Sequence, residues 1–341
     1  MKRIGSVCSS VGYSKLATAK LRTSEERKMA DQCIDAVIIW VDGSDPDWQR
    51  ERALFLPKAN TDNRTERYRD MGLLRYLFRG LETYAPWIRT VHFITCGQKP
   101  KWLNSNAPKL HCISHAEYIP SEYLPTFNSN VIELNFHRIE SLGEKFIYFN
   151  DDQFLIDAVS PEFFFHRDLP KQSASFLPLY FDPTDAVFSG ILATDLQVIY
   201  RNFSQVDFMK HLHKHADPRN DGLINSFRNI KNIFTKTQGI EYSHLPAPLL
   251  KACISDLWNS EYNILDATSR NKFRSAEDAN QYLVQLWQIA TGHYSPTNKK
   301  KQGKYFYLPN SYLAAADCIQ RQQAKTICLN DGEFALSLIH I

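Results

Sequence analysis

Residues 34–48, IDAVIIWVDGSDPDW, decide the fold of this chain. The stretch begins with a largely apolar run from Ile34 to Val41 and stops at Asp42-Gly43-Ser44-Asp45-Pro46, a dense turn signal. Residues 146–155, FIYFNDDQFL, repeat this pattern, because apolar residues lead directly into Asn150, Asp151 and Asp152. A short apolar run bounded by turn residues is typical of a buried strand. The sequence therefore predicts two strands that each end in carboxylates.

A helical pattern and two more strand patterns lie between these runs. Residues 67–87, RYRDMGLLRYLFRGLETYAPW, carry apolar residues at helical spacing, and Pro86 ends the pattern. TVHFIT (90–95) and KLHCISH (109–115) read as short strands. This alternation predicts an α/β fold with a mostly parallel central sheet and flanking helices. Sites in such sheets gather beyond the carboxyl ends of the strands, so the acids after both strands are expected in one cleft.

The sequence of the second half of the chain predicts fewer helices and strands. Residues 166–185, HRDLPKQSASFLPLYFDPTD, read as a loop or an irregular insert, and DGLINSFRNIKNIF (221–234) reads as a helix. FRSAEDANQYLVQLWQIATGH (273–293) is the clearest helix of this half. Ser275 is its expected N-cap with Asp278 three residues later, and Gly292 is its expected end.

Composition excludes some classes of protein. The 341 residues are 43% hydrophobic and 23% charged with a net charge of +3, which is normal for a soluble globular protein and too small to argue for nucleic-acid binding. Seven scattered cysteines fit reduced thiols in a cytosolic protein. No stretch approaches the ~20 apolar residues of a membrane span. Residues 1–33 are basic and polar without the apolar core of a signal peptide, and we expect an arm that either is solvated or touches an anionic membrane surface.

Acidic and basic groups suggest a phosphate-binding metal site. The adjacent pair Asp151-Asp152 could hold Mg²⁺ together with phosphate oxygens, and the alternative is a solvated turn. Five arginines between residues 64 and 79 suit phosphate oxygens, and the alternative is a solvated basic face. His244 is a candidate general base, although a lone loop histidine is more often structural. Arg274 precedes a predicted helix, where its guanidinium and the helix dipole would both favour a phosphate. The alternative is that Arg274 is a surface residue near the helix cap.

The joint order of these stretches resembles a known family. IDAVIIWVDGSDPDW, then residues 67–104, then LPTFNSNVIELNFHRIESLGEKFIYFNDD (124–152) are similar to the first two conserved regions of the Stealth family. HLPAPL (244–249), KFRSAEDANQYLVQLW (272–287) and ICLNDG (327–332) are similar to its later regions. The resemblance covers residues 34–335. The family comprises sugar-1-phosphate transferases, including bacterial capsular polysaccharide phosphotransferases and the animal enzyme that tags lysosomal glycans with N-acetylglucosamine-1-phosphate.

The resemblance implies roles for individual residues. The family's catalytic positions fall on Glu133, Asp152, His244, Arg274 and Asp331. The predicted substrate-binding residues are Asp42, Asp45, Arg67, Arg69, Arg75, Asn128, His137 and Arg138. The predicted ligands of Mg²⁺, or of Mn²⁺, are Asp151, Asp152 and Asp331.

The resemblance also implies an organisation. We expect a glycosyltransferase-A-like nucleotide-sugar fold with a helical insert, in one catalytic domain that follows the basic arm of residues 1–33. Within residues 34–341, the nucleotide-sugar and metal half would be 34–165, a variable insert 166–240, and the second half 241–341. A cytoplasmic location is expected.

The implied reaction moves N-acetylhexosamine-1-phosphate from a UDP-N-acetylhexosamine donor to a hydroxyl of an oligo- or polysaccharide, releasing UMP in capsular polysaccharide synthesis. His244 is the expected base, with Glu133 as its rival or orienting partner. One alternative is a metal-dependent glycosyltransferase that releases UDP, and another is a non-catalytic glycan-binding protein. Peripheral contact with the inner face of a bacterial membrane or with capsule-assembly proteins is a further expectation, and a nucleic-acid partner is not expected.

Overall fold

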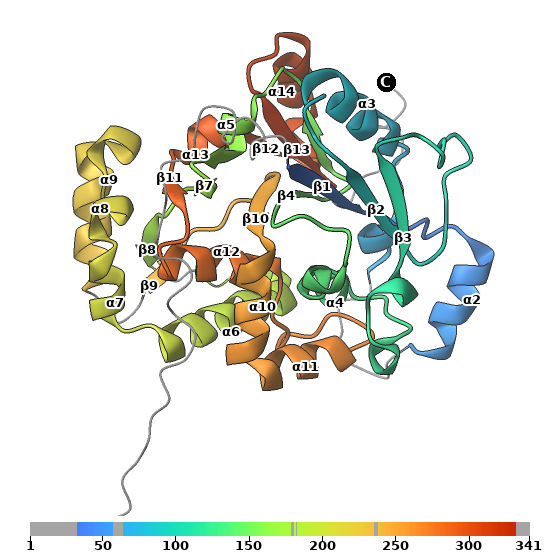
Figure 1. The fold of residues 1–341 in the computed structure, drawn as a ribbon, viewed down its shortest axis with the longest axis horizontal. Coiled ribbons are helices and arrows are strands. Elements are labelled where there is room, and N and C mark those ends of the chain that lie inside the picture. The colour runs from blue at the N-terminus through green and yellow to red at the C-terminus, as the bar shows by residue number, and fades with distance from the viewer. Residues whose placement is uncertain (1–32, 57–63, 179–180, 182, 235–237, 332–341) are drawn as a thin grey trace, which may run out of the picture.

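The computed structural model describes residues 33–56, 64–178, 181, 183–234 and 238–331. Its central sheet has five strands in the order β10-β4-β1-β2-β3 (Figure 1). β1 (Ile34–Ile39), β2 (Val91–Thr95), β3 (Leu110–Ser114) and β4 (Lys145–Phe149) are mutually parallel, and β10 (Ala247–Leu250) pairs antiparallel with β4 at one edge. The predicted strands are therefore confirmed, as is the α/β class with a mostly parallel sheet. β10 was not predicted, since Pro248 weakens its strand pattern; an edge strand tolerates proline.

Both faces of the sheet are buried, which explains the apolar runs that revealed its strands. Alternate residues of a strand point to opposite faces. Val37 and Phe146 accordingly pack into one core, and Ile38 and Ile147 pack into the other. In the first half of the chain, the helices are α2 (Pro46–Leu54), α3 (Leu74–Tyr84), α4 (Ser129–Leu134) and α5 (Pro161–Phe164).

The predicted helix of residues 67–87 is confirmed in part. α3 begins only at Leu74, because residues 70–72 form a turn in which the Gly72 N–H donates to Asp70 Oδ1 and Gly72 has a φ of +70°. The helix ends at Tyr84, just before Pro86.

The structure also contains short 3₁₀ helices. They are η1 (Thr65–Tyr68), η2 (His115–Glu117), η3 (Ser121–Tyr123), η4 (Phe136–Arg138) and η5 (Pro183–Asp185).

The second half is mainly helical. Its helices are α6 (Ala186–Asn202), α7 (Gln205–Lys210), α8 (Leu212–His215), α9 (Pro218–Ile233), α10 (Lys251–Ser260), α11 (Tyr262–Arg270), α12 (Gln281–Ala290), α13 (Lys299–Gln302) and α14 (Leu308–Gln320). Small sheets join β12 (Lys304–Tyr307), β13 (Thr326–Asn330) and β5 (Gln153–Leu155); β11 (Ser295–Pro296), β7 (Leu169–Gln172) and β6 (Phe165–His166); and β8 (Phe176–Pro178) with β9 (Gln238–Ile240). Of the two readings of residues 166–185, a plain loop is wrong for the strands β6, β7 and β8, whose partners local sequence does not reveal, and an irregular insert describes the stretch better.

The predicted start of the 273–293 helix is also wrong. α12 begins at Gln281, and Asn280 caps it by accepting a hydrogen bond from the Tyr282 N–H. The Ser275 N–H does donate to Asp278 as the pattern predicts, but this bond and the one from the Asp278 N–H to the Ser275 carbonyl close a separate turn over residues 275–278, and the helix begins only at Gln281. The predicted end is confirmed, since Gly292 follows the helix with a φ of +72°.

The basic arm of residues 1–33 lies outside the described residues except for Cys33, and the boundaries at 165 and 240 stay predictions. Among the described residues, no helix combines the length and apolar character that crossing a membrane requires.

Candidate active site

A cleft of about 1030 Å³ collects side chains from segments far apart in the chain. Glu133 comes from α4, Asp152 from the turn after β4, and His244 from the segment between β9 and β10. Arg274 comes from the loop before α12, and Asp331 follows β13. The structure thus brings all five predicted catalytic residues to the lining of one cleft, although it assigns them no role.

The turn between β4 and β5 explains how two adjacent carboxylates serve one cleft. On an extended strand their side chains would point to opposite faces. Here β4 ends at Phe149, the Gln153 N–H donates to the carbonyl of Asn150, and both Asp151 and Asp152 line the cleft. The Leu329 N–H donates to the carbonyl of Asp152 over 2.8 Å, so β13 holds this turn in place.

The Asp152 carboxylate is the centre of a hydrogen-bonded cluster. Its Oδ2 lies 3.2 Å from Nε2 of His244 and accepts from Cys328 Sγ and Asn330 Nδ2, each at 3.3 Å. Nδ1 of His244 lies 2.7 Å from the Tyr282 hydroxyl. Burial alone would lower the pKa of His244, but the neighbouring Asp152 carboxylate outweighs it and raises the pKa. Burial would raise the pKa of Asp152, yet these partners hold it below its ordinary value.

Glu133 is buried at the base of the cleft. It accepts hydrogen bonds from the Tyr148 hydroxyl at 2.9 Å and from the Gln281 N–H at 3.4 Å. Burial raises the pKa of Glu133, and the positive charge of Arg274 only partly opposes this shift. The Arg274 guanidinium is anchored through a 2.6 Å hydrogen bond from Nη2 to Ser129 Oγ, one helical turn before Glu133 on α4. A carboxylate with a raised pKa therefore faces a fixed cation.

The acidic turn has the properties of a cation site. Burial, followed by the charges of Asp152 and Asp70, raises the pKa of Asp151 to about 7. Oδ1 of Asp152 is buried and has no hydrogen-bond partner among the described residues. Mg²⁺ is typically bound through one or two carboxylates, with waters and phosphate oxygens completing its shell. The residues of this turn fit such an ion.

The donor atoms that lie close enough to share one ion differ from the predicted set. Within the described part of the chain, Asp152, His244 and Cys328 each offer a ligand atom, all within 4.8 Å of one another. Imidazole and thiol favour softer ions than Mg²⁺. Asp331 is not in this group and instead accepts from Nε of Arg69 at 2.8 Å. A cation site at Asp152 is thus supported, while the identity of the ion is not decided by these donors.

Arginines also line the cleft. Arg64 and Arg67 both reach Oδ2 of Asp185, at 2.9 and 3.3 Å, and Arg69 pairs with Asp331. A guanidinium group that a carboxylate already orients loses less conformational entropy when its N–H groups bind a phosphate. The placement of Arg67 and Arg69 therefore suits their predicted contact with substrate.

Three predicted substrate-binding residues in the first half lie outside the cleft lining. The carboxylate of Asp42 accepts from the backbone N–H and the hydroxyl of Ser44, and Asp45 caps α2. The guanidinium of Arg75 lies 5.9 Å from the ring centre of Trp102. Local turn, cap and stacking interactions account for these positions, so a substrate contact stays a prediction.

The remaining three also lie outside the lining. Asn128 is buried, caps α4 and donates to Asp278 at 2.8 Å. His137 and Arg138 both pack against Trp258, with the Arg138 guanidinium 4.8 Å from a ring centre. These residues support the shape of the second half, and their predicted contact with substrate is likewise untested.

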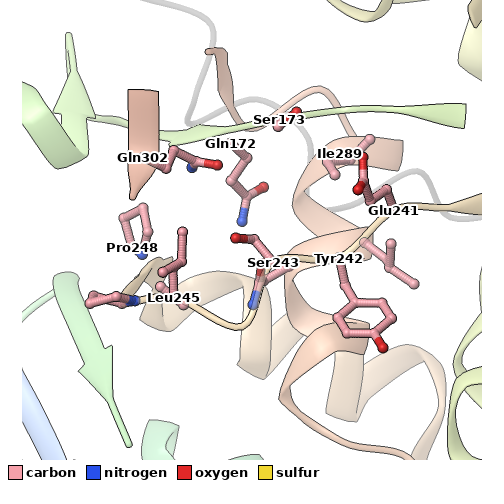
Figure 2. A pocket seen from close by; sticks show the side chains of 13 residues that line it. Gln172, Ser173, Glu241, Tyr242, Ser243, Leu245, Pro248, Ile289 and Gln302 are labelled. Carbon is pink, nitrogen blue, oxygen red and sulfur yellow. The ribbon is translucent and has the colours of Figure 1, made fainter. Parts of the chain in front are cut away.

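A second, smaller cavity lies behind the segment that carries His244 (Figure 2). It measures about 20 Å³, and Gln172 and Ser243 extend toward each other inside it. The Gln172 amide and the Ser243 hydroxyl are buried without hydrogen-bond partners among the described residues. The cavity has room for about one water molecule and none for a sugar nucleotide, so the large cleft is the candidate active site.

Sequence reasoning missed Tyr282 and Cys328. Tyr282 lies in the first turn of an apolar helix, and Cys328 lies within a strand pattern, so both read as core residues. Only their closeness to His244 and Asp152 reveals another role, and no local signal could have found them.

Comparison with known proteins identifies the family of this chain. Residues 34–58 match Stealth protein CR1, conserved region 1, and residues 67–173 match Stealth protein CR2, conserved region 2. The chain is 35% identical to a capsular polysaccharide phosphotransferase WcwK of Streptococcus pneumoniae and 36% identical to the receptor polysaccharide phosphotransferase WefC of Streptococcus oralis. Each alignment covers 88% of this chain and 90% of the relative. The exopolysaccharide phosphotransferase cps2G of Lactiplantibacillus plantarum is 32% identical, with 89% of both chains covered.

The relatives define the chain as an enzyme of the phosphotransferase class. The chain belongs to the Stealth family, as the sequence resemblance predicted.

A solved structure of the galactosyltransferase LgtC in complex with donor and acceptor sugar analogs aligns with 86% of both chains. Its identity is 11% and its TM-score is 0.33. A likeness of this size supports no conclusion about fold or activity, so the glycosyltransferase-A-like fold stays a prediction.

Proposed function

We propose that this enzyme transfers a sugar-1-phosphate from a nucleotide-sugar donor, UDP-N-acetylhexosamine, to a hydroxyl of an oligo- or polysaccharide in capsular polysaccharide synthesis. The observation that carries the proposal is the convergence of an acidic turn, oriented arginines and two candidate bases on one cleft. Phosphoryl transfer depends mainly on positioning and on stabilisation of negative charge. The phosphotransferase names of the relatives support the same reaction class.

In the proposed reaction, an acceptor hydroxyl oxygen attacks the phosphorus atom that carries the sugar. The bond from that phosphorus to the bridging oxygen of the diphosphate breaks, and UMP leaves with the bridging oxygen. The hydroxyl proton passes to a base of the protein, and the product is a phosphodiester between two sugars. Arg67, Arg69 and Arg274 would hold phosphate oxygens through their forks.

Hydrogen bonding separates the two candidate bases. Both ring nitrogens of His244 are already engaged, one with Asp152 and one with Tyr282. Glu133 retains acceptor capacity, and its raised pKa makes it a stronger base than an ordinary carboxylate. We therefore assign proton removal to Glu133. His244 then orients the Asp152 carboxylate.

Asp151 and Asp152 would hold the divalent cation, Mg²⁺ or Mn²⁺. Bound there, the cation would supply positive charge for the donor's diphosphate. Asp331 accepts a hydrogen bond from Arg69, and its predicted role as a ligand stays a prediction.

The test is an incubation of the full chain with UDP-N-acetylglucosamine, Mg²⁺ and short glycan acceptors, followed by phosphorus NMR. We expect UMP and a new diester signal, both lost with EDTA. UDP without a diester would identify a glycosyltransferase instead. If there is no turnover, other UDP-sugars are tested as donors. Binding of the glycans without turnover of any donor would identify a non-catalytic glycan-binding protein. The predicted cytoplasmic location is tested separately by fractionation of the source cells.

A further inference from the structure

Helix α9 presents apolar side chains to solvent. The exposed fractions of its residues are 68% for Leu223, 85% for Ile224 and 71% for Phe227, and Phe234 at its end is 53% exposed. Figure 1 shows α7, α8 and α9 along one edge of the molecule, away from the central sheet. Single exposed apolar residues are ordinary, whereas several on one helix face mark an interaction site.

The inner side of α9 is held against the rest of the protein by hydrogen bonds. Asn229 is buried there, and its amide donates to the carbonyls of Ala174 at 2.9 Å and His215 at 2.7 Å and accepts from the Phe176 N–H at 3.1 Å. Ile233 is buried on the same side. The helix is therefore fixed in its rotation by satisfied hydrogen bonds. Its apolar outer face cannot be buried by rolling the helix without breaking them.

Positive charge accompanies this face. Residues 223–233 contain Arg228 and Lys231, both exposed, and no acidic residue. The exposed lysines 299–301 of α13 lie close by, since Nδ2 of Asn298 donates to the carbonyl of Asn220 over 2.7 Å. Apolar side chains beside lysine and arginine match a bilayer surface with anionic headgroups, where each cation adds to binding.

We propose that α9 is a docking helix for an anionic lipid surface. Leu223, Ile224 and Phe227 enter the boundary between headgroups and acyl chains, and Arg228 and Lys231 contact the phosphates. A second copy of the chain fits this face less well, because a twofold contact would set its basic residues near those of the partner. The proposal concerns binding alone, so it is independent of the proposed reaction.

Docking in this way would orient the active site. Lys299 of α13 lines the cleft and pairs with Glu241 at its rim, and the same helix is tied to the start of α9. α13 therefore connects the lining of the cleft to the start of the docking helix.

The test is cosedimentation of the full chain with vesicles of phosphatidylglycerol and phosphatidylcholine, compared with vesicles of phosphatidylcholine alone. Ile224→Gln combined with Phe227→Gln should weaken binding at least about tenfold, since two large apolar groups are removed. Lys231→Gln should weaken it about fivefold, with a smaller dependence on salt. Leu313→Gln is the matched control, because Leu313 is 69% exposed on α14, and its binding should be unchanged.

Phe227→Trp adds a direct measurement that does not depend on loss of binding. Its fluorescence should shift to the blue on anionic vesicles and be quenched by lipids brominated on the acyl chains. Equal binding by the glutamine double variant and the wild type would overturn the proposal and point to another surface, such as the basic residues 1–33. Equal binding to neutral vesicles would also overturn it, as would a dimer in light scattering that Phe227→Gln dissociates.

Discussion

Nε2 of His244 lies 3.2 Å from Oδ2 of Asp152, although 92 positions separate the two residues in the chain. The opposite ring nitrogen lies 2.7 Å from the Tyr282 hydroxyl, so the imidazole is held from both sides. On the proposed assignment, this histidine orients the Asp152 carboxylate and Glu133 removes the proton. We therefore expect Tyr282 to be a positioning residue for the acidic turn.

Tyr282→Phe should lower kcat about tenfold and leave KM for the acceptor nearly unchanged, because it frees the imidazole without removing it. The pH profile of kcat should shift as the His244 ring loses its fixed orientation. Steady-state kinetics across a pH series make the measurement. Tyr262→Phe on α11, which removes an exposed hydroxyl, is the control and should match the wild type. Unaltered kinetics in Tyr282→Phe would show that the hydrogen bond has no part in turnover.

Glu133→Gln should lower kcat by about 10²–10⁴-fold, the range expected for loss of a general base. A carboxylate with a raised pKa loses its negative charge as the pH falls, so the activity of the wild type should decline on the acid limb of its pH profile. The residual activity of Glu133→Gln should not show this acid limb. His244→Asn is the comparison. If it abolishes the acid limb while Glu133→Gln retains it, the base is His244.

Arg274→Lys should reduce kcat/KM about tenfold or more, because a lysine keeps the charge but loses the guanidinium fork. Arg270→Lys on the neighbouring α11 is the matched control, since Arg270 forms an exposed ion pair with Asp266 four residues earlier. Steady-state assays with varied donor separate the two variants. Full activity in Arg274→Lys would contradict the proposal that the Arg274 guanidinium binds phosphate through two N–H groups.

Asp152→Asn should weaken binding of a divalent ion about tenfold or more, because it removes the carboxylate whose Oδ1 is buried without a partner among the described residues. Titration with Mn²⁺, followed by electron paramagnetic resonance without substrate, measures this apart from turnover. Asp157→Asn, two residues after β5, is the control. Equal Mn²⁺ affinity for wild type and Asp152→Asn would place the ion elsewhere, and activity that survives EDTA would argue against any required metal.

Stability should depend on pH through His215, which is buried in the insert with Nδ1 2.6 Å from the Tyr294 hydroxyl. Burial lowers the pKa of His215 to about 3, below the unfolded value near 6.5. The unfolded chain therefore binds the proton more readily, so this contribution is complete above pH 6.5 and declines as the pH falls toward 3. The slope is at most about 1.4 kcal/mol per pH unit.

Urea unfolding at several pH values tests this expectation. His215→Asn should flatten the pH dependence of the free energy of unfolding below pH 6.5. Tyr294→Phe should lower that free energy by about 1 kcal/mol yet keep the slope, because the histidine remains. A slope that survives in His215→Asn would assign it to other groups.

Local patterns predicted much of the fold. β1 to β4 are apolar because both faces of the sheet are covered, and Gly292 ends α12 because its positive φ suits glycine. Ser275 misled, because Asp278 does accept the Ser275 N–H as the capping pattern predicts, but this bond closes a turn that ends before α12 begins at Gln281. That buried carboxylate also accepts hydrogen bonds from Asn128 and Asn130, nearly 150 positions away.

The sequence by itself determined the residue types of the site, because the carboxylates, arginines and histidine stand in recognisable motifs. Only the tertiary structure decided which of them meet. Arg69 pairs with Asp331 across 262 positions, and the donors around Asp152 come from the His244 segment and β13. Such contacts depend on how sheets and helices pack over the whole domain. Local propensity acts over a few residues, so it carries no information about them.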